Sequence, residues 1–164
     1  MRIPTYRLIN TLGLSVCVTA MLFAVLFLQG TLKLEPCPLC IVDRIIIMAI
    51  GLVFFIAIVQ NPKRTGQRIY SGINLALVSL GLAVGARHVW LQHLPADQVP
   101  QCGPGLDYML DVFPLSKTLK MVFSGSGECA EIQWQFLGLS IPEQTLLLFL
   151  ALTGLVLVQF IRKA

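Results

Sequence analysis

Four long apolar blocks constrain this chain more than any other feature of its sequence. The first runs for 21 residues without a charge, which is enough to cross a hydrocarbon core of about 30 Å at about 1.5 Å per helical residue. The other blocks reach a similar length once a few polar residues at their ends are included. We therefore predict a single all-α membrane domain, a four-helix bundle with spans at 8–28, 41–59, 69–91 and 144–161.

The composition agrees with a membrane location. Of the 164 residues, 56% are hydrophobic and 12% are charged, whereas a soluble domain carries about 25% charged residues. The formal net charge is +4 and the basic residues are scattered, so nucleic-acid binding is not expected.

The basic residues set the expected orientation. Four spans place both termini on one side of the bilayer, together with the loop 60–68. That side carries seven basic residues, namely Arg2, Arg7, Lys63, Arg64, Arg68, Arg162 and Lys163. The loops of the other side carry only Lys33, Lys117 and Lys120. By the positive-inside rule the first side is cytoplasmic, and the loops 29–40 and 92–143 lie outside.

The five cysteines divide by location. Cys37, Cys40, Cys102 and Cys129 fall in the two outer loops, where an oxidising environment favours disulfide chemistry. Cys17 falls in the middle of the first span, where a thiol is hard to ionise. We interpret Cys17 as a packing residue.

Cys37-Pro38-Leu39-Cys40 has the two-residue spacing of a redox pair at the start of the second span. The positive potential of a helix N-terminus is expected to favour a thiolate at Cys40. Half of a zinc site and a structural bridge are the alternatives. No second closely spaced cysteine pair exists, because Cys102 and Cys129 are 27 positions apart, so no metal is expected.

The second pair of outer cysteines lies in flexible sequence. Cys102 follows Pro100-Gln101, and Cys129 follows the Gly/Ser-rich run 124–127. These contexts favour exchange of partners, although a bridge that braces the loop is the alternative. Between them, apolar residues at helical spacing predict a short interfacial helix, at Leu115, Leu119, Val122 and Phe123.

Charged residues near the outer ends of the spans are candidates to form one site with the cysteines. Arg44 follows Cys40 by four residues, so the two share a helix face. Arg44 either snorkels to the headgroups or pairs with Asp43 as an interfacial residue, or it stabilises a thiolate and a membrane-soluble electron acceptor. Arg87, His88 and His93, at the outer end of the third span, are candidates to complete that site.

Taken together, the chain resembles the disulfide bond formation protein B (DsbB) family, the quinone-linked thiol oxidases of the bacterial inner membrane. The resemblance covers nearly the whole chain. It is carried by the Cys37-Pro-Leu-Cys40-x-x-x-Arg44 string, by Cys102 in its proline-rich stretch, and by the string from Ser126 to Leu139 around Cys129.

The resemblance implies an electron relay. A periplasmic DsbA-like oxidant would be reoxidised by a Cys102–Cys129 disulfide, and Cys129 would then exchange with Cys37. The electrons would leave from Cys40 to ubiquinone, or to menaquinone without oxygen, beside Arg44. The family's quinone-proximal histidine matches His93 or His88, with His93 slightly favoured. Two rivals are a vitamin K epoxide reductase-like oxidase and a non-catalytic membrane adaptor with structural disulfides.

Overall fold

The structure is a computed structural model that describes residues 6–95, 97–99, 108 and 111–161. Cys102, Arg2, Arg162 and Lys163 lie outside the described residues. The elements in chain order are α1 (Tyr6–Leu22), the π-helix η1 (Phe23–Thr31), α2 (Pro38–Gln60), α3 (Arg64–Gln92), α5 (Leu115–Ser124), α6 (Gly127–Ala130), β1 (Gln135–Phe136), β2 (Leu139–Ser140) and α7 (Ile141–Ile161).

The four-helix membrane bundle is confirmed. In the part of the chain that the structure describes, four helices are long and apolar enough to cross a membrane, namely 6–31, 38–60, 64–92 and 141–161. Each begins two to five residues before the predicted span, because helices continue past the apolar core into polar flanking sequence. Proline lies in the first turn of α2 and α7, where its missing N–H removes no intrahelical hydrogen bond.

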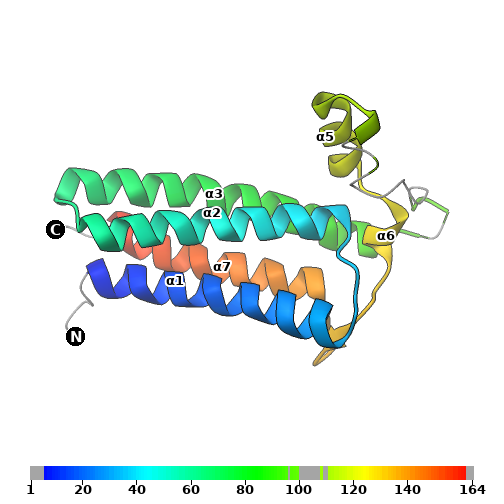
Figure 1. The fold of residues 1–164 in the computed structure, drawn as a ribbon, viewed down its shortest axis with the longest axis horizontal. Helices are drawn as coiled ribbons and strands as arrows, with labels where there is room; N and C mark the ends of the chain where they lie inside the picture. The colour runs from blue at the N-terminus through cyan, green and yellow to red at the C-terminus, as the bar shows by residue number, and fades with distance from the viewer. Residues whose placement is uncertain (1–5, 96, 100–107, 109–110, 162–164) are drawn as a thin grey trace.

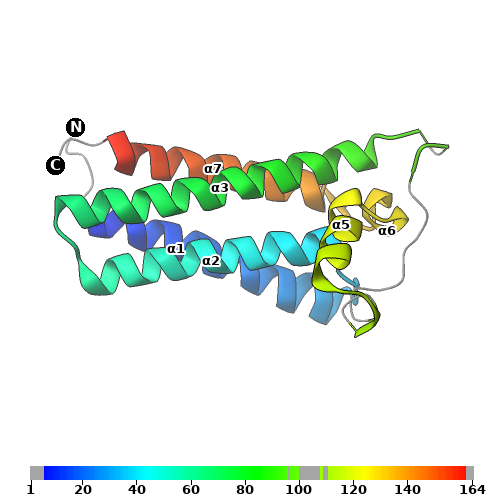
Figure 2. The same cartoon turned by 90° about the horizontal axis from the view of Figure 1, so that it is seen from above.

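One end of the bundle carries the start of α1, the end of α7 and the α2–α3 connection (Figure 1). The segments α5 and α6 gather at the other end in both views (Figure 2). This arrangement has the up-down order that the sequence predicts. It brings the N-terminus of α2, the C-terminus of α3 and α6 to the same end of the molecule.

Close helix contacts depend on two glycines. A Cβ added at Gly81 of α3 would lie 2.4 Å from the ring of Phe149 in α7, and one added at Gly13 of α1 would lie 2.5 Å from the ring of Phe54 in α2. Both rings are fully buried. In a membrane, where helices gain little from leaving lipid, such close packing is a main source of association.

The long outer loop contains more structure than the sequence analysis predicts. The helix α5 confirms the predicted short helix, and its interfacial location stays a prediction. The antiparallel pair β1–β2 was not predicted; it is closed by Leu137 and Gly138, both at positive φ. The π-helical end of the first span, η1, was not predicted either.

Candidate functional site

The redox pair is built into the first turn of α2. Cys37 is the N-cap residue, with extended backbone, and Pro38 opens the helix. The backbone N–H of Cys40 donates to Sγ of Cys37 over 3.4 Å, and the two sulfurs lie 3.0 Å apart. An amide of the helix N-terminus therefore contacts the sulfur of Cys37, whereas the sequence analysis assigned the effect of the helix N-terminus to Cys40; a thiolate at Cys40 stays a prediction.

The short helix α6 brings Cys129 to this pair. Its sulfur is within 4.8 Å of both the Cys37 sulfur and a ring nitrogen of His88. Cys129 is 1% exposed. Contact with Cys37, followed by burial, raises the pKa of the Cys129 thiol well above its ordinary value. Cys37, Cys40 and Cys129 are all unbonded thiols in this structure, and the predicted pairing of Cys129 with Cys102 lies outside the described residues.

Two thiols and an imidazole are also ligand types that zinc accepts. These two thiols are Cys37 and Cys129, whose sulfurs lie within 4.8 Å of each other and of a ring nitrogen of His88. The distance between Cys37 and Cys40 concerns a different pair, and it indicates that these two sulfurs do not share a zinc ion. Two thiolates on one tetrahedral zinc, with bonds of about 2.3 Å, are about 3.8 Å apart, whereas these sulfurs lie 3.0 Å apart. That distance is suited to formation of a Cys37–Cys40 disulfide after a small rotation.

His88 connects the pair to a buried acid. Its Nε2 lies 3.5 Å from Sγ of Cys37, and its Nδ1 lies 3.8 Å from Oδ2 of Asp43. His88 and Asp43 are 2% and 3% exposed. His93, by contrast, is exposed at the end of α3 and its Nδ1 contacts the carbonyl of Val89. The third span thus presents His88 to the cysteines.

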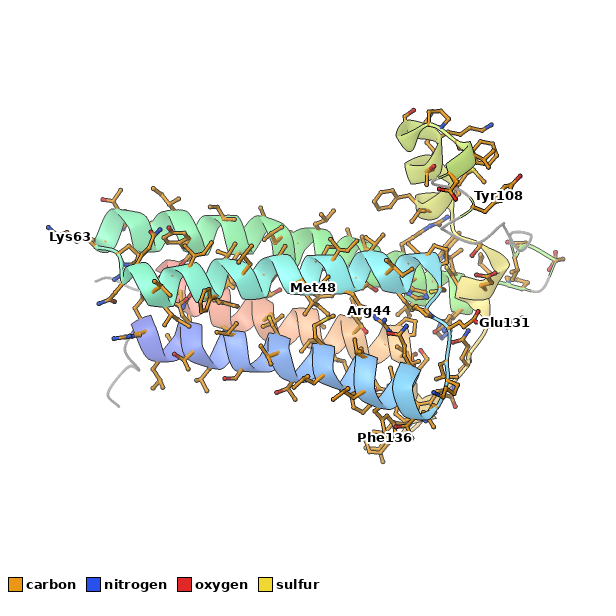
Figure 3. The ribbon with its side chains drawn as sticks, viewed as in Figure 1. Arg44, Met48, Lys63, Tyr108, Glu131 and Phe136 are labelled. Atoms are coloured by element: carbon orange, nitrogen blue, oxygen red, sulfur yellow. The ribbon has the colours of Figure 1, made fainter. Side chains whose placement is uncertain are left out.

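Arg44 is held by the first span. Its Nη1 donates to Oε1 of Gln29 over 2.6 Å, a contact provided by the π-helical turn that carries Gln29. Figure 3 shows Arg44 between α2 and α1, toward the end of the bundle that carries Glu131 and far from Lys63. Arg44 and Asp43 therefore have different partners, and the pairing of the two that the sequence analysis considered is replaced by Arg44–Gln29 and Asp43–His88.

A cavity of about 250 Å³ lies beside this constellation. Its polar wall includes Cys40, Asp43, Arg44 and His88. Apolar side chains form most of the remaining wall, including Ala20, Met21, Leu28, Trp134 and Leu148. Oδ1 of Asp43 and Nδ1 of His88 are buried and have no hydrogen-bond partner among the described residues. An apolar cavity with a guanidinium and an imidazole suits a flat ring with two carbonyl acceptors, as a quinone has.

One other candidate, Arg87, lies elsewhere, and one residue of the site was not predicted. The Nη2 atom of Arg87 donates to the carbonyl of Ser124, and the guanidinium stacks 4.3 Å from the ring of Trp90. It belongs to the contact with α5 and does not line the cavity. Gln29 was not foreseen, because a glutamine at the end of an apolar block has no sequence signal that identifies its partner.

Comparisons with known proteins agree on one family. The family model described as "Disulfide bond formation protein DsbB" matches residues 6–159. A protein from Psychrobacter sp. (strain PRwf-1) is 55% identical over 92% of this chain and 89% of its own length. Proteins from Nitrosococcus oceani and Saccharophagus degradans are 52% and 45% identical, over 89% and 99% of this chain and 86% and 98% of their own lengths. All three relatives are named "Disulfide bond formation protein B".

Proposed function

Because this chain belongs to the DsbB family of disulfide bond formation proteins, and is therefore a multi-pass, disulfide-forming membrane oxidoreductase, we propose that it passes electrons from a reduced DsbA-like carrier to a membrane quinone. The four outer cysteines would carry the electrons, and Arg44 and His88 would hold the quinone ring. The protein would lie in the bacterial inner membrane, with both termini in the cytoplasm.

The observation that carries the proposal is the placement of three sulfurs beside one cavity. Cys129 lies beside Cys37, Cys37 contacts Cys40, and Cys40 lines the cavity. This order supports a relay from the outer loop to the bilayer. A thiolate released at Cys129 would be a strong nucleophile toward Cys37, because nucleophilicity rises with the thiol's pKa.

The chemistry balances at the Cys37–Cys40 pair. Formation of the disulfide breaks two S–H bonds, makes one S–S bond and releases two electrons and two protons. A quinone bound in the cavity supplies the acceptor for both. The protein's part is to hold Cys40 at the cavity wall, to place a cation there through Arg44, and to keep apolar side chains around the ring.

The proposed carrier is a periplasmic thioredoxin-fold oxidant that exchanges with Cys102. Cys102 would form the mixed disulfide, and Cys129 would be released toward Cys37. This assignment rests on the sequence match, since Cys102 lies outside the described residues.

Thiol trapping in cells tests the relay. Cells are quenched with acid, free thiols are tagged with a bulky maleimide, and the tagged states are separated by gel mobility, with and without quinone synthesis. We expect the Cys37–Cys40 pair and then the Cys102–Cys129 pair to become reduced when quinone synthesis is blocked. Unchanged thiol states in quinone-depleted cells would exclude quinone as the acceptor.

The carrier can be identified with the variant Cys129→Ala, which leaves Cys102 without its proposed partner. We expect a mixed disulfide between Cys102 and a periplasmic protein, which mass spectrometry identifies. The matched control is the double variant Cys102→Ala/Cys129→Ala, which should trap nothing. A mixed disulfide that persists in the double variant would mean that another cysteine meets the carrier.

A further inference from the structure

Resting on the proposed function, we propose that Cys37, His88 and Asp43 form a proton-transfer unit. His88 is the catalytic base that takes the proton of the Cys37 thiol as the Cys37–Cys40 disulfide forms. Asp43 is a positioning residue that orients the His88 ring. The quinone-site role proposed above for His88 does not by itself require either step.

The geometry places the imidazole between the other two groups. Nε2 of His88 lies 3.5 Å from the Cys37 sulfur, and Nδ1, on the opposite side of the ring, lies 3.8 Å from Oδ2 of Asp43. A carboxylate at Nδ1 favours the tautomer that carries its proton there, which leaves Nε2 free to accept. The carboxyl contact is longer than a hydrogen bond, as catalytic contacts often are before the substrate binds.

Burial separates this unit from water. Cys37, Asp43 and His88 are 6%, 3% and 2% exposed, so bulk water is a poor acceptor for the Cys37 proton. Within the described ranges of the chain, Oδ1 of Asp43 and Nδ1 of His88 have no other hydrogen-bond partner. Neither atom is therefore held in a competing interaction, and both residues line the cavity to which the protons must go.

The groups that face His88 come from the start of α2 and from α6. Cys37 and Asp43 belong to the start of α2, and Cys129 comes from α6. Arg44 is the nearby cation of the same cavity and is bound to Gln29. Arg87, next to His88 in sequence, is bound to the carbonyl of Ser124. Glu128 and Glu131 line a smaller cavity together with His88, and Asp43 is the acid for which a contact with the His88 ring is observed.

The transfer of the Cys37 proton is one part of the two-electron reaction proposed above. The Cys37 S–H bond breaks, its proton goes to Nε2 of His88, and the Cys37 sulfur forms the S–S bond with Cys40. The two electrons and the two protons end on the quinone, one of the protons by way of His88. Asp43 stays ionised throughout and stabilises the imidazolium.

Alkylation of the reduced, quinone-free protein in detergent tests the unit without the quinone reaction. Iodoacetamide is added across a pH series with EDTA present, and tandem mass spectrometry resolves Cys37 from Cys40. For Asp43→Asn and His88→Gln we expect the rate of Cys37 alkylation at pH 7 to fall about tenfold, because the acceptor of the Cys37 proton is misoriented or lost. The double variant should show no larger loss of rate than either single variant, because the two residues act as one unit.

Two matched variants separate positioning from packing. Asp43→Glu keeps the carboxylate and should recover most of the Cys37 rate, whereas His93→Gln makes the same substitution at the exposed histidine and should leave the profile unchanged. Equal Cys37 profiles for the wild type, Asp43→Asn and His88→Gln would overturn the proposal. So would a wild-type profile that changes when EDTA is omitted, since a bound metal would then control Cys37.

A measurement on the wild-type protein tests the proposal even if the variants do not fold. Nitrogen NMR of histidine-labelled protein distinguishes the two neutral tautomers. We expect His88 to carry its proton on Nδ1 when neutral; a neutral ring protonated on Nε2 would overturn the proposal. Failure of quinone reduction with these results intact would instead count against the proposed function alone.

Discussion

Nη1 of Arg44 lies 2.6 Å from Oε1 of Gln29, and this hydrogen bond ties the second span to the π-helical end of the first. The π-helical turn matters because it changes which side chains of the first span face α2. Arg44 is therefore held at the cavity wall by a neighbour that lies 15 residues earlier in the chain. Short π-helical segments are often found at functional sites.

Gln29→Leu should loosen Arg44. A hydrogen bond to a charged group contributes about 1.5 kcal/mol or more, so we expect the KM for quinone to rise about tenfold. The kcat should change little if the contact acts mainly on binding. Steady-state quinone reduction by the purified protein measures both. Gln29→Glu, which keeps an acceptor, should remain near the wild-type KM; equal KM values for all three proteins would show that Gln29 does not position Arg44.

Arg44→Ala should affect quinone reduction and thiol exchange differently. The cation at the cavity is lost, while Cys129 and its surroundings are untouched, so quinone reduction should weaken and thiol exchange with the carrier should continue. Stopped-flow mixing with reduced carrier measures the thiol exchange, and quinone absorbance measures the reduction of the quinone. An unchanged apparent quinone affinity would return Arg44 to the role of an interfacial, snorkelling arginine.

Cys129 should titrate unusually high. Contact with Cys37 and burial raise its pKa, so the neutral thiol persists above the ordinary cysteine pKa of about 8.5 and the thiolate forms only at higher pH. We expect the midpoint of its alkylation profile to lie above that of the same cysteine in denatured protein. Cys37→Ala should lower the midpoint, because the contact with Cys37 is the largest cause. A native midpoint at or below the denatured one would contradict this account.

Cys17 should prove dispensable for turnover. It is 3% exposed and its Cβ lies 3.3 Å from the position of a Cβ added at Gly51, so it fills space between α1 and α2. We expect Cys17→Ala to keep near-normal activity and to lose about 1 kcal/mol of stability from the small cavity. Activity per folded molecule and thermal unfolding in detergent report the two effects separately. Loss of activity in a variant that reaches normal membrane levels would assign Cys17 a chemical role.

Gly81→Ala should weaken the contact between α3 and α7. The added methyl would meet the ring of Phe149 at 2.4 Å, and overpacking of this kind costs about 1–3 kcal/mol. Gly154→Ala is the matched control in the same helix pair, because nothing lies within 4 Å of its added Cβ. Thermal unfolding should show a lower Tm for the first variant alone. Equal values of Tm would mean that the helices separate slightly at no measurable cost.

Much of the fold is predictable because spanning a membrane is governed by local composition. Each apolar block is long enough to form its own helix, and backbone groups in lipid must be satisfied within that helix. The ends of the helices were less predictable, because helical hydrogen bonding continues beyond the apolar residues. The early start of α3 at Arg64 is an example. The pair β1–β2 depends on a turn at Leu137 and Gly138 that no hydrophobic period marks.

The candidate site likewise has a part that the sequence predicts and a part that it does not. The spacing of Cys37, Cys40 and Arg44 places them on one helix, so their proximity follows from the sequence alone. His88 and His93 both lie near the end of one span, and the sequence analysis slightly favoured His93. Only packing decides between them: α3 presents His88 to Cys37 and leaves His93 exposed.

The sequence by itself therefore determined that the chain forms four membrane helices, which end of the bundle carries the cysteines, and that one pair begins a helix. These properties depend on residues close together in the chain. The tertiary structure decided that Cys129 meets Cys37, that Asp43 meets His88 and that Gln29 holds Arg44. Those contacts join residues from different helices and loops, and their geometry depends on how the helices pack and where η1 turns, which local patterns do not specify.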